Sequence, residues 1–343
     1  MDVRDNVRRN KLLQVLTACM LVLCACDNVI YDYEGDCSVN YKVRFRYDYN
    51  MKFADAFAHE VNSVTLYALD KDNRVVWQRT EQGAALASGD YEMTLDVAPG
   101  EYSLLAWCGT TGKESFTIPQ TLDGEELTCT LNKEYDTDGA AFVNKDLDRL
   151  FHGWLPSQQM PETEGTYIYT VPLVKNTNSV RVVLQHLSGE PVDKDKFTFA
   201  IHDSNGRMDW DNTLLPDEPV TYYAWHTDAG EAGMRSPVRA GQAPTRSVFS
   251  AAVAELTVAR LVKGQDTRLT ISNKETGKVV ISIPLIDYAL LVKGFYNREM
   301  DDQEYLDRED TYDMVFFLDE GDRWLDAYIY INSWKVVLQN TGL

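Results

Sequence analysis

Positive charge is scarce in this sequence. Of its 343 residues, 33 are lysine or arginine and 53 are aspartate or glutamate, which gives a formal net charge of −20 at pH 7. A protein that binds nucleic acid needs a basic patch to neutralise phosphates, and the sequence contains no cluster of that kind. We therefore expect no nucleic acid among the partners, and we interpret the acidity as a source of solubility and mutual repulsion.

Motifs of catalysis and metal binding are also missing. The histidines form no HExxH or other close metal-binding spacing, and no GxSxG nucleophile motif occurs. Two segments imitate a phosphate loop, GTTGKES at 109–115 and ETGKVV at 275–280, but both lack its spacing, so they predict turns. The sequence predicts no catalytic residue, metal ligand or cofactor, and we expect neither a small-molecule substrate nor an enzyme. The five histidines are His59, His152, His186, His202 and His226.

The front of the chain lacks a hydrophobic run long enough to span a membrane. Leu12–Leu23 has twelve mostly apolar residues, whereas a transmembrane helix needs about 20. Four basic residues precede this run, and the small residue Ala25 follows it. A positive segment, a short apolar segment and a small residue at the cleavage site are typical of a secretory signal. We predict that residues 1–25 form this signal and are removed.

The end of the signal predicts a lipid attachment. Leu23-Cys24-Ala25-Cys26 resembles a bacterial lipobox, whose cysteine becomes the first mature residue and carries acyl chains such as palmitate. Two or three acyl chains anchor a protein stably, whereas one is marginal. The alternative is a plain secretory signal cut nearby, with Cys26 an ordinary thiol. Residues 26–37 then form an acidic tether, and the mature chain has 29 basic and 51 acidic residues, a net charge of −22.

Cysteine is rare in the mature chain. Besides Cys26 it contains Cys37, Cys108 and Cys129. An oxidising compartment permits one disulfide among these three thiols and leaves one thiol over. We predict at most one disulfide and prefer Cys37 with Cys108, because Cys129 lies in a strand-like pattern where a buried thiol is ordinary.

Short strands dominate the rest of the sequence. Val39–Tyr49 alternates apolar and polar residues over eleven positions, which is typical of a half-buried strand. Tyr91–Val97 alternates again, and Glu101–Cys108 resumes a strand after a turn at Pro99-Gly100. After an acidic stretch that is poor in pattern, a second series of strands is expected at Tyr167–Leu173, Ser179–Leu187, Phe197–Asp203, Val220–Thr227, Val248–Leu261, Arg268–Asn273, Lys278–Leu285, Tyr312–Leu318, Trp324–Asn332 and Lys335–Leu338.

These patterns predict a mainly β protein. We expect two antiparallel β-sandwiches of Greek-key or transthyretin-like type in tandem, at residues 38–165 and 166–343. Asp287–Asp310, rich in Leu, Glu and Asp, is the best helical candidate and predicts a short helical insertion in the second sandwich. Two tryptophan motifs, His152-Gly153-Trp154 and Asp209-Trp210-Asp211, are either sugar-binding platforms or residues of the core and its rim, and we favour the core.

Five blocks of the sequence resemble one family. They are the lipobox, YDYNMKFADAFAHEVNSVTLYALD, PGEYSLLAWCG, PLVKNTNSVRVVLQHLSG and FFLDEGDRWLDAYIYINSWKVVLQN. In this order they resemble the FimB-like fimbrial anchor family of Bacteroides-type bacteria, over most of the mature chain. The resemblance implies a two-sandwich lipoprotein at the base of a type V pilus. It would bind fimbrial shaft subunits, end their assembly and hold the fibre on the outer membrane through its lipid. Only the lipid cysteine, here Cys26, carries over as a functional position, because the family has no known active site.

Two hypotheses on function follow. The first is a structural anchor that joins its fimbrial partner by β-strand addition. Its candidate segment is Ala327–Leu338, AYIYINSWKVVL, which is β-prone with Lys335 as its single charge; the segment is either this docking strand or simply the last core strand. The second hypothesis is a lipid-anchored surface protein that binds carbohydrate or processes glycans.

Overall fold

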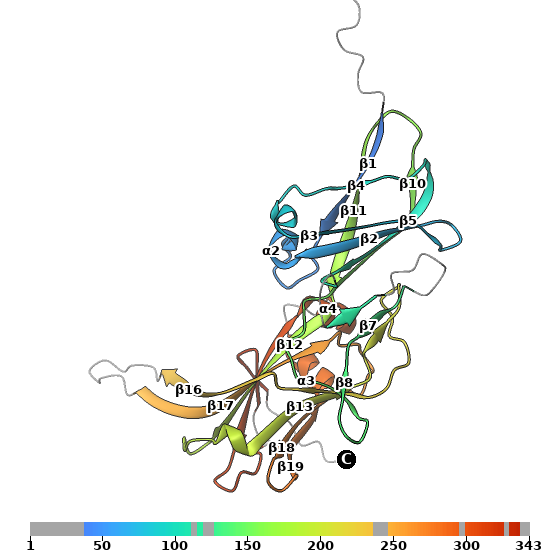
Figure 1. The fold of residues 1–343 in the computed structure, drawn as a ribbon. Helices are drawn as coiled ribbons and strands as arrows, with labels where there is room; N and C mark the ends of the chain where they lie inside the picture. Colours follow the sequence, from blue (N-terminus) through green and yellow to red (C-terminus); the bar gives the residue numbers. More distant parts are fainter. Residues whose placement is uncertain are drawn as a thin grey trace, which may run out of the picture.

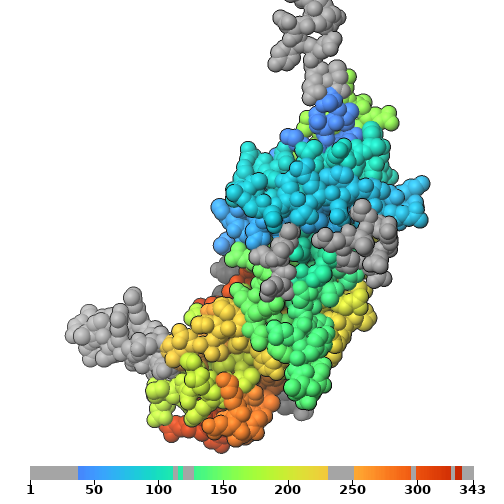
Figure 2. Space-filling model, viewed as in Figure 1, coloured from blue at the N-terminus to red at the C-terminus, as the bar shows by residue number. Residues whose placement is uncertain are grey.

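The computed structural model describes residues 38–110, 115–118, 127–235, 246–294, 299–325 and 329–336, with only the backbone considered at 231–235, 246–250 and 334–336. Two β-rich bodies are stacked along one long axis (Figure 1). Strand β1 lies at the upper end, and β18 and β19 lie at the lower end. In the space-filling view the green middle part of the chain lies against both the blue N-terminal part and the yellow and orange C-terminal part (Figure 2).

The upper body is built from a seven-stranded sheet that folds over on itself. Its strands, in spatial order, are β3 (Val75–Gln82), β2 (Ser63–Leu69), β5 (Gly100–Cys108), β10 (Phe151–Met160), β11 (Gly165–Lys175), β1 (Val39–Arg46) and β4 (Met93–Leu95). Strands β10 and β11 pair at only three positions, so this junction acts as the fold line. Apolar side chains from both halves, among them Val43, Phe45, Leu66 and Leu104, share one core. The upper body is therefore a sandwich made from one sheet.

The lower body is a sandwich of two six-stranded sheets. One sheet runs β16 (His226–Arg235), β17 (Arg246–Ala259), β12 (Thr177–His186), β20 (Thr311–Leu318), β21 (Ile329–Ile331) and β22 (Trp334–Val336). The other runs β19 (Val279–Pro284), β18 (Arg268–Asn273), β13 (Phe197–Asp203), β15 (Val220–Tyr223), β9 (Ala141–Val143) and β8 (Glu134–Tyr135). Alternate residues of the facing strands, such as Val182, Phe199 and Phe316, are fully buried between them, as period-two alternation requires.

A small third layer joins the two bodies. Strands β6 (Phe116–Thr117), β7 (Cys129–Leu131) and β14 (Arg207–Met208) form a three-stranded sheet. Side chains of this layer bury Trp107 and Leu105, which point to the outer face of the upper sheet, and they continue into the core of the lower sandwich. Because both its faces are covered, β2 is buried at every residue and shows no alternation.

The described helices are short. In the upper body α2 (Phe57–Glu60) and a 3₁₀ turn, η1 (Ala84–Ala87), cover one end of the sandwich. A second 3₁₀ turn, η2 (Lys194–Lys196), precedes β13 in the lower body. In the lower body α3 (Leu285–Leu291) and α4 (Asp302–Arg308) lie between β19 and β20. Asp301 caps α4 by accepting a hydrogen bond from the backbone N–H of Glu304 at 2.7 Å. The predicted helical insertion is confirmed as these two helices.

The mainly β sandwich fold is confirmed, and the pairing directions add one feature. Each of the three large sheets contains one parallel pair: β1 with β11, β12 with β20, and β15 with β9. Alternation alone predicts a strand but not the direction of its neighbour, so the sequence pattern could not reveal them. The expected division after residue 165 falls at the first residue of β11, which pairs with β1 and β10 of the upper sheet; as a domain boundary it stays a prediction.

Candidate functional site

Of the three cysteines predicted as lipid or disulfide sites, Cys26 and Cys37 lie outside the described residues. The lipid site and the tether therefore stay predictions. Cys108 is a free, fully buried thiol at the end of β5, and burial raises the pKa of its thiol well above the usual range. Cys108 pairs with Phe151, which pairs with Lys175 at the far end of β11, whereas Ser38 lies beside Gly165 at the near end. This placement gives the Cys37–Cys108 disulfide no support.

The C-terminal hairpin divides the candidate docking segment into two parts. Strand β21 pairs with β20 on one side and β22 on the other, and the side chains of Ile329 and Ile331 are fully buried. This part of the segment is a core strand. The turn residues Asn332 and Ser333 have φ of 48° and 69°, which is typical of the mirror-image turn of a two-residue hairpin.

Strand β22 is the part that presents an edge. It is the last strand of its sheet in the described chain and pairs with β21 alone. In an antiparallel hairpin the residue pair beside a two-residue turn is hydrogen-bonded and the next pair is not. The pairs are Ile331 with Trp334 and then Tyr330 with Lys335. The backbone N–H and C=O of Lys335 therefore point to the outer side of the sheet.

Other sheet edges carry the devices that normally prevent strand addition. The edge strand β3 carries an extra residue, Val76, opposite Ala68 and Leu69, and an ion pair between Arg79 and Glu81 at 2.5 Å. The edge strand β19 carries an extra residue, Val280, opposite Ile271 and Ser272, and ends in Pro284, while β8 has only two residues. Charge, bulges, proline and shortness all hinder edge pairing. Strand β16, with ten residues at the opposite end of the β22 sheet, is the longest edge strand in the described chain.

Ion pairs fix the two bodies against each other. Lys175, the last residue of β11, makes ion pairs with Glu60 of α2 at 3.1 Å and with Asp310 next to β20. The guanidinium of Arg308 lies over the ring of Tyr49, 4.0 Å from its centroid. These contacts join residues that lie far apart in the sequence, and they hold the upper and lower bodies in one orientation.

A buried ion pair supports the same junction from the lower body. Arg260 donates to both carboxylate oxygens of Asp307 at 2.8 Å and to the backbone oxygen of Asn212 at 2.6 Å. The side chains of Arg260 and Asp307 are 14% and 7% exposed. A bidentate pair of this kind sets geometry as well as charge, so it positions α4 against the loop after β14.

The two tryptophan motifs come together at the junction. The rings of Trp154 and Trp210 are 4.9 Å apart at 59°. Burial lowers the pKa of His152 to about 4, so its ring is neutral and Nε2–H donates to the Trp210 carbonyl 2.7 Å away. Both motifs border an open cavity of about 610 Å³ whose walls include His152, Trp154, Asp211 and Arg260. Sequence alone could not bring these motifs together, because strand pairing decides their distance.

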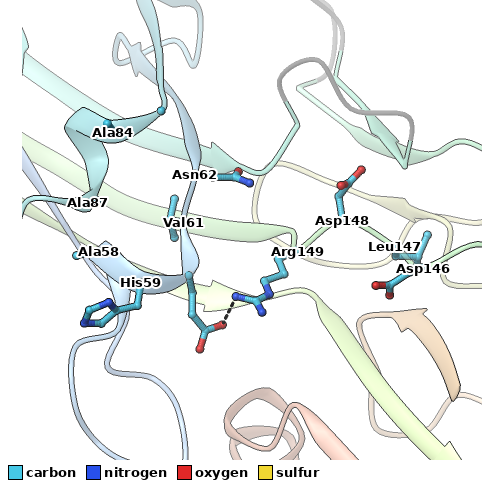
Figure 3. A pocket seen from close by; sticks show the side chains of 12 residues that line it. Ala58, His59, Val61, Asn62, Ala84, Ala87, Asp146, Leu147, Asp148 and Arg149 are labelled. Carbon is cyan, nitrogen blue, oxygen red and sulfur yellow. Dashed lines mark ion pairs between the residues drawn. The ribbon is translucent and has the colours of Figure 1, made fainter.

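A second cavity lies beside α2 (Figure 3). It has a volume of about 500 Å³ and is bordered by α2, η1 and the loop at 146–149. Arg149 and Glu60 approach each other across it at 3.8 Å. Thr257 donates a hydrogen bond to Asp146, and Ser115 donates one to Asp148. The two carboxylates therefore position the loop and are not an open binding site.

The described part of the chain offers no metal centre, because no group of three or more His, Cys, Asp or Glu side chains in it could hold an ion. None of the helices described is long and apolar enough to cross a bilayer. The imitation phosphate loop at 109–115 begins at Gly109, whose φ of 87° fits a turn; residues 111–114 lie outside the described chain.

Comparison with known proteins gives a consistent result. The family model described as fimbrillin-A associated anchor proteins Mfa1 and Mfa2 matches residues 33–340. The minor fimbrium anchoring subunit Mfa2 of Porphyromonas gingivalis is 23% identical over 293 residues, which are 83% of each chain. The solved structure of the fimbrial anchor protein Mfa2 from the same species has a TM-score of 0.62 at 18% identity, over 88% of this chain and 99% of that one, and shows a common fold.

Two solved structures from Bacteroides thetaiotaomicron are also similar. A candidate adhesin is 35% identical, with a TM-score of 0.77 over 90% of this chain and all of that one. A candidate polysaccharide-binding protein is 29% identical, with a TM-score of 0.74 over 89% of this chain and all of that one. The matching family is one of structural fimbrial anchors and not of enzymes; it implies interaction with fimbrial subunits and association with the cell envelope. This chain belongs to the family of fimbrillin-A associated anchor proteins Mfa1 and Mfa2.

Proposed function

We propose that this protein is a surface-exposed lipoprotein that holds a fimbria on the outer membrane and ends its assembly. The lipobox at Cys26 supplies the membrane end, and the acidic segment 26–37 supplies a tether that enters the fold at β1. The family supports the fimbrial end. At the opposite end of the chain, β22 is the surface on which a shaft subunit would dock.

The one-sided pairing of β22 is the observation that carries the docking step. An added strand needs free backbone donors and acceptors, and Lys335 directs its N–H and C=O outward. Beyond this residue the sequence continues with Val336, Val337 and Leu338, which are β-prone and uncharged. We infer that a shaft subunit pairs along this edge, and that the main-chain hydrogen bonds supply affinity.

Replacement of the lipid cysteine tests the membrane end. We expect a Cys26→Ala strain to release fimbriae into the medium with the variant protein still attached to the fibres. A Cys37→Ala strain is the matched control, because it loses a nearby thiol but keeps the lipobox. Fractionation with immunoblotting, and electron microscopy of cells and medium, provide the measurement. Partition of the Cys26→Ala protein with the outer membrane at the parental level would contradict the lipid attachment.

Deletion of the gene tests the anchoring role itself. Fibres should be shed, and they should be longer than those of the parent because termination is lost, while shaft subunits are still made. Unchanged fibre length, abundance and attachment in the deletion strain, with no related anchor gene present, would contradict the anchor function.

A proline at one backbone position tests strand addition. Lys335→Pro removes an outward N–H without removing a bond to β21, since proline is tolerated on a free edge. Lys335→Ala is the matched control, because it removes the charge but keeps the N–H. We expect the proline variant to fold and reach the membrane but to bind less shaft subunit in pull-down assays, while the alanine variant binds normally. Equal binding by both variants would exclude this edge and leave β16 as the alternative.

A second candidate function is the binding of carbohydrate at the tryptophan cavity. It is favoured by the proximity of Trp154 and Trp210 beside an open cavity and by the description of one similar structure as a candidate polysaccharide-binding protein. Aromatic faces beside polar groups suit sugar rings. Glycan-array screening of the parent and of Trp154→Ala tests it: signals that the parent gives and the variant lacks would support the site, and a silent parent would reject it.

A further inference from the structure

The path of the chain through the fold runs along two parallel strand pairs in succession. In the upper body β1 pairs with β11 at eight consecutive positions, from Val39 with Gly165 to Arg46 with Pro172. The first residues of both strands lie at the same end of the body. The N–H of Gly165 donates to the oxygen of Ser38 at 3.2 Å. The last residue of β11, Lys175, lies at the other end, where the chain leaves for the lower body.

This arrangement decides how a pull on the chain would load the upper sandwich. A force at the N-terminus pulls β1 from its first residue, and the opposing force pulls β11 from its last residue. The two strands are then driven past each other along their length. Since the strands are parallel and in register, all eight positions resist together. If both strands were pulled from the same end, the hydrogen bonds would break one after another.

The last connection from the upper body to the lower body is a single buried residue. Asn176 separates β11 from β12, is 0% exposed, and donates its backbone N–H to the oxygen of Leu150 at 2.7 Å. Its side-chain amide exchanges hydrogen bonds with that of Asn212 at 2.6 and 3.2 Å. The link is thus tied to both bodies, and force passes from β11 directly into β12.

The lower body repeats the same geometry. Strand β12 pairs in parallel with β20 at eight positions, from Ser179 with Thr311 to His186 with Leu318. A load that enters at Thr177 pulls β12 from its first residue. It must cross the β12–β20 ladder before it reaches the C-terminal hairpin, because β21 and β22 are held through β20.

We propose that the protein is a tension-bearing link, in which two parallel strand pairs loaded in shear act in series between the membrane end and the fimbrial end. The proposal rests on the anchoring function above, which places the pulling forces at the two ends of the chain. The partner it implies is a fibre under load, docked at the C-terminal hairpin. The junction contacts of Lys175 and Arg260 keep the two ladders aligned with that load.

Single-molecule pulling on the mature chain tests the upper pair with a matched control. Handles are attached through cysteines introduced in a Cys26→Ser, Cys37→Ser background; Cys108 and Cys129 are fully buried. Ser38→Cys with Ser188→Cys, which lies just after β12, loads β1 against β11 in shear. Ser38→Cys with Glu164→Cys pulls the same two strands from one end. The same β1–β11 hydrogen bonds are loaded with both pairs of attachment points, and only the direction of the load differs.

The expected result is a severalfold higher unfolding force for the Ser38 and Ser188 attachment than for the Ser38 and Glu164 attachment. Equal forces, or a lower force for the Ser38 and Ser188 attachment, would overturn the proposal. Thermal unfolding of both double variants must match the parent, which removes differences in fold stability as an explanation.

The lower pair is tested by moving the second handle. Attachment at Glu320, beyond the end of β20, loads both ladders in shear, whereas attachment at Thr311 pulls β12 and β20 from the same end. We expect the Ser38 and Thr311 pair to yield at a low force and the Ser38 and Glu320 pair to hold to a high one. A low force at Glu320 as well would remove the lower ladder from the proposal. These measurements use isolated protein, so they stand apart from fibre shedding in cells, which alone tests the anchoring function.

Discussion

The two strands nearest the ends of the described chain differ in how they are paired. Strand β1 has neighbours on both sides, β11 along its whole length and β4 at three positions. Its own side chains Tyr41, Val43 and Phe45 are buried in the core. Strand β22 has one neighbour at three positions. The end of the fold next to the predicted lipid is therefore closed to strand addition, and the opposite end is open. In the proposed function, the open edge would receive the shaft subunit, while the closed end keeps the first strand of the fold in place.

The largest effect is expected from a proline in the closed strand. Val43 is paired with both Tyr169 and Met93, so Val43→Pro must break a ladder bond on one side or the other. A lost buried hydrogen bond costs about 1–3 kcal/mol, and misfitted packing adds about 1–3 kcal/mol. Urea unfolding monitored by tryptophan fluorescence should show a loss of this combined size. Arg44→Ala, on the exposed face of β1, is the control and should cost less than about 1 kcal/mol.

The two ends of the fold keep a fixed relative position only if the junction between the bodies is stable, and the Arg260–Asp307 pair tests this stability. Arg260→Ala leaves Asp307 buried without its partner, and breaking such a pair costs about 3–5 kcal/mol, toward the lower figure here because Arg260 keeps some solvent contact. The double variant Arg260→Met, Asp307→Leu should recover most of the loss, because no unpaired charge remains. A double variant as unstable as the single one would assign the effect to packing.

A change of pH should act on the same junction. Burial first, and then the neighbouring Asp310, raise the pKa of Glu309 to about 7, against about 4.3 in an unfolded chain. The folded state then binds this proton more tightly, so its contribution to stability falls as the pH rises from about 4.5 to about 7. Glu309→Gln should therefore gain melting temperature relative to the parent at pH 7.5 but not at pH 4.5. Glu320→Gln, on the surface, should show no such difference.

The titration of His152 should change the stability of the fold with pH in the opposite direction to that of Glu309, and the two effects should be measured together. Its lowered pKa means that the unfolded chain binds the proton more tightly, so stability falls as the pH drops from about 6.5 to about 4. Calorimetric scans across this range, with Glu309→Gln present and absent, separate the two trends.

The smallest effect is expected in the open strand. Lys335→Pro should change the free energy of unfolding by no more than about 0.5 kcal/mol, as for a surface substitution, because the lost N–H faces outward. The same substitution at Val43 and at Lys335 thus measures the contrast directly. A large destabilisation at Lys335 would mean that its N–H bonds within the protein, and the open edge would be lost as a docking surface.

Local patterns could predict much of the fold but not its long-range pairing. The alternation of Val39–Tyr49 marked β1 correctly because one face of that strand is solvated, and the turn at Pro99-Gly100 marked the start of β5. The pattern at Tyr167–Leu173 marked a strand but not its partner, and so not the parallel ladder with β1. Alternation records which face is buried, while pairing depends on how residues far apart in the sequence meet.

The candidate sites, too, could be predicted from the sequence only in part. The β-propensity and low charge of Ala327–Leu338 marked this segment as a candidate for docking, but only the hairpin turn in the structure separates a buried β21 from an edge β22. The ion pairs of Lys175 and Arg260 escaped sequence reasoning altogether, since a single lysine or arginine among many acids carries no signal of its partner. The Trp154–Trp210 contact was hidden for the same reason.

The interleaving of the two bodies has a consequence for the way the molecule is made. Strand β1 is the first described strand of the chain to be made, yet its partner β11 ends at residue 175, and the lower sheet is completed only by β21 near residue 330. Strands β8 and β9 are made before β10 and β11 but belong to the lower sandwich. Pairings of such large sequence separation form slowly, and the unpaired edges stay exposed to aggregation meanwhile. The early strands of the chain therefore stay open to wrong pairing until its last strands have been made.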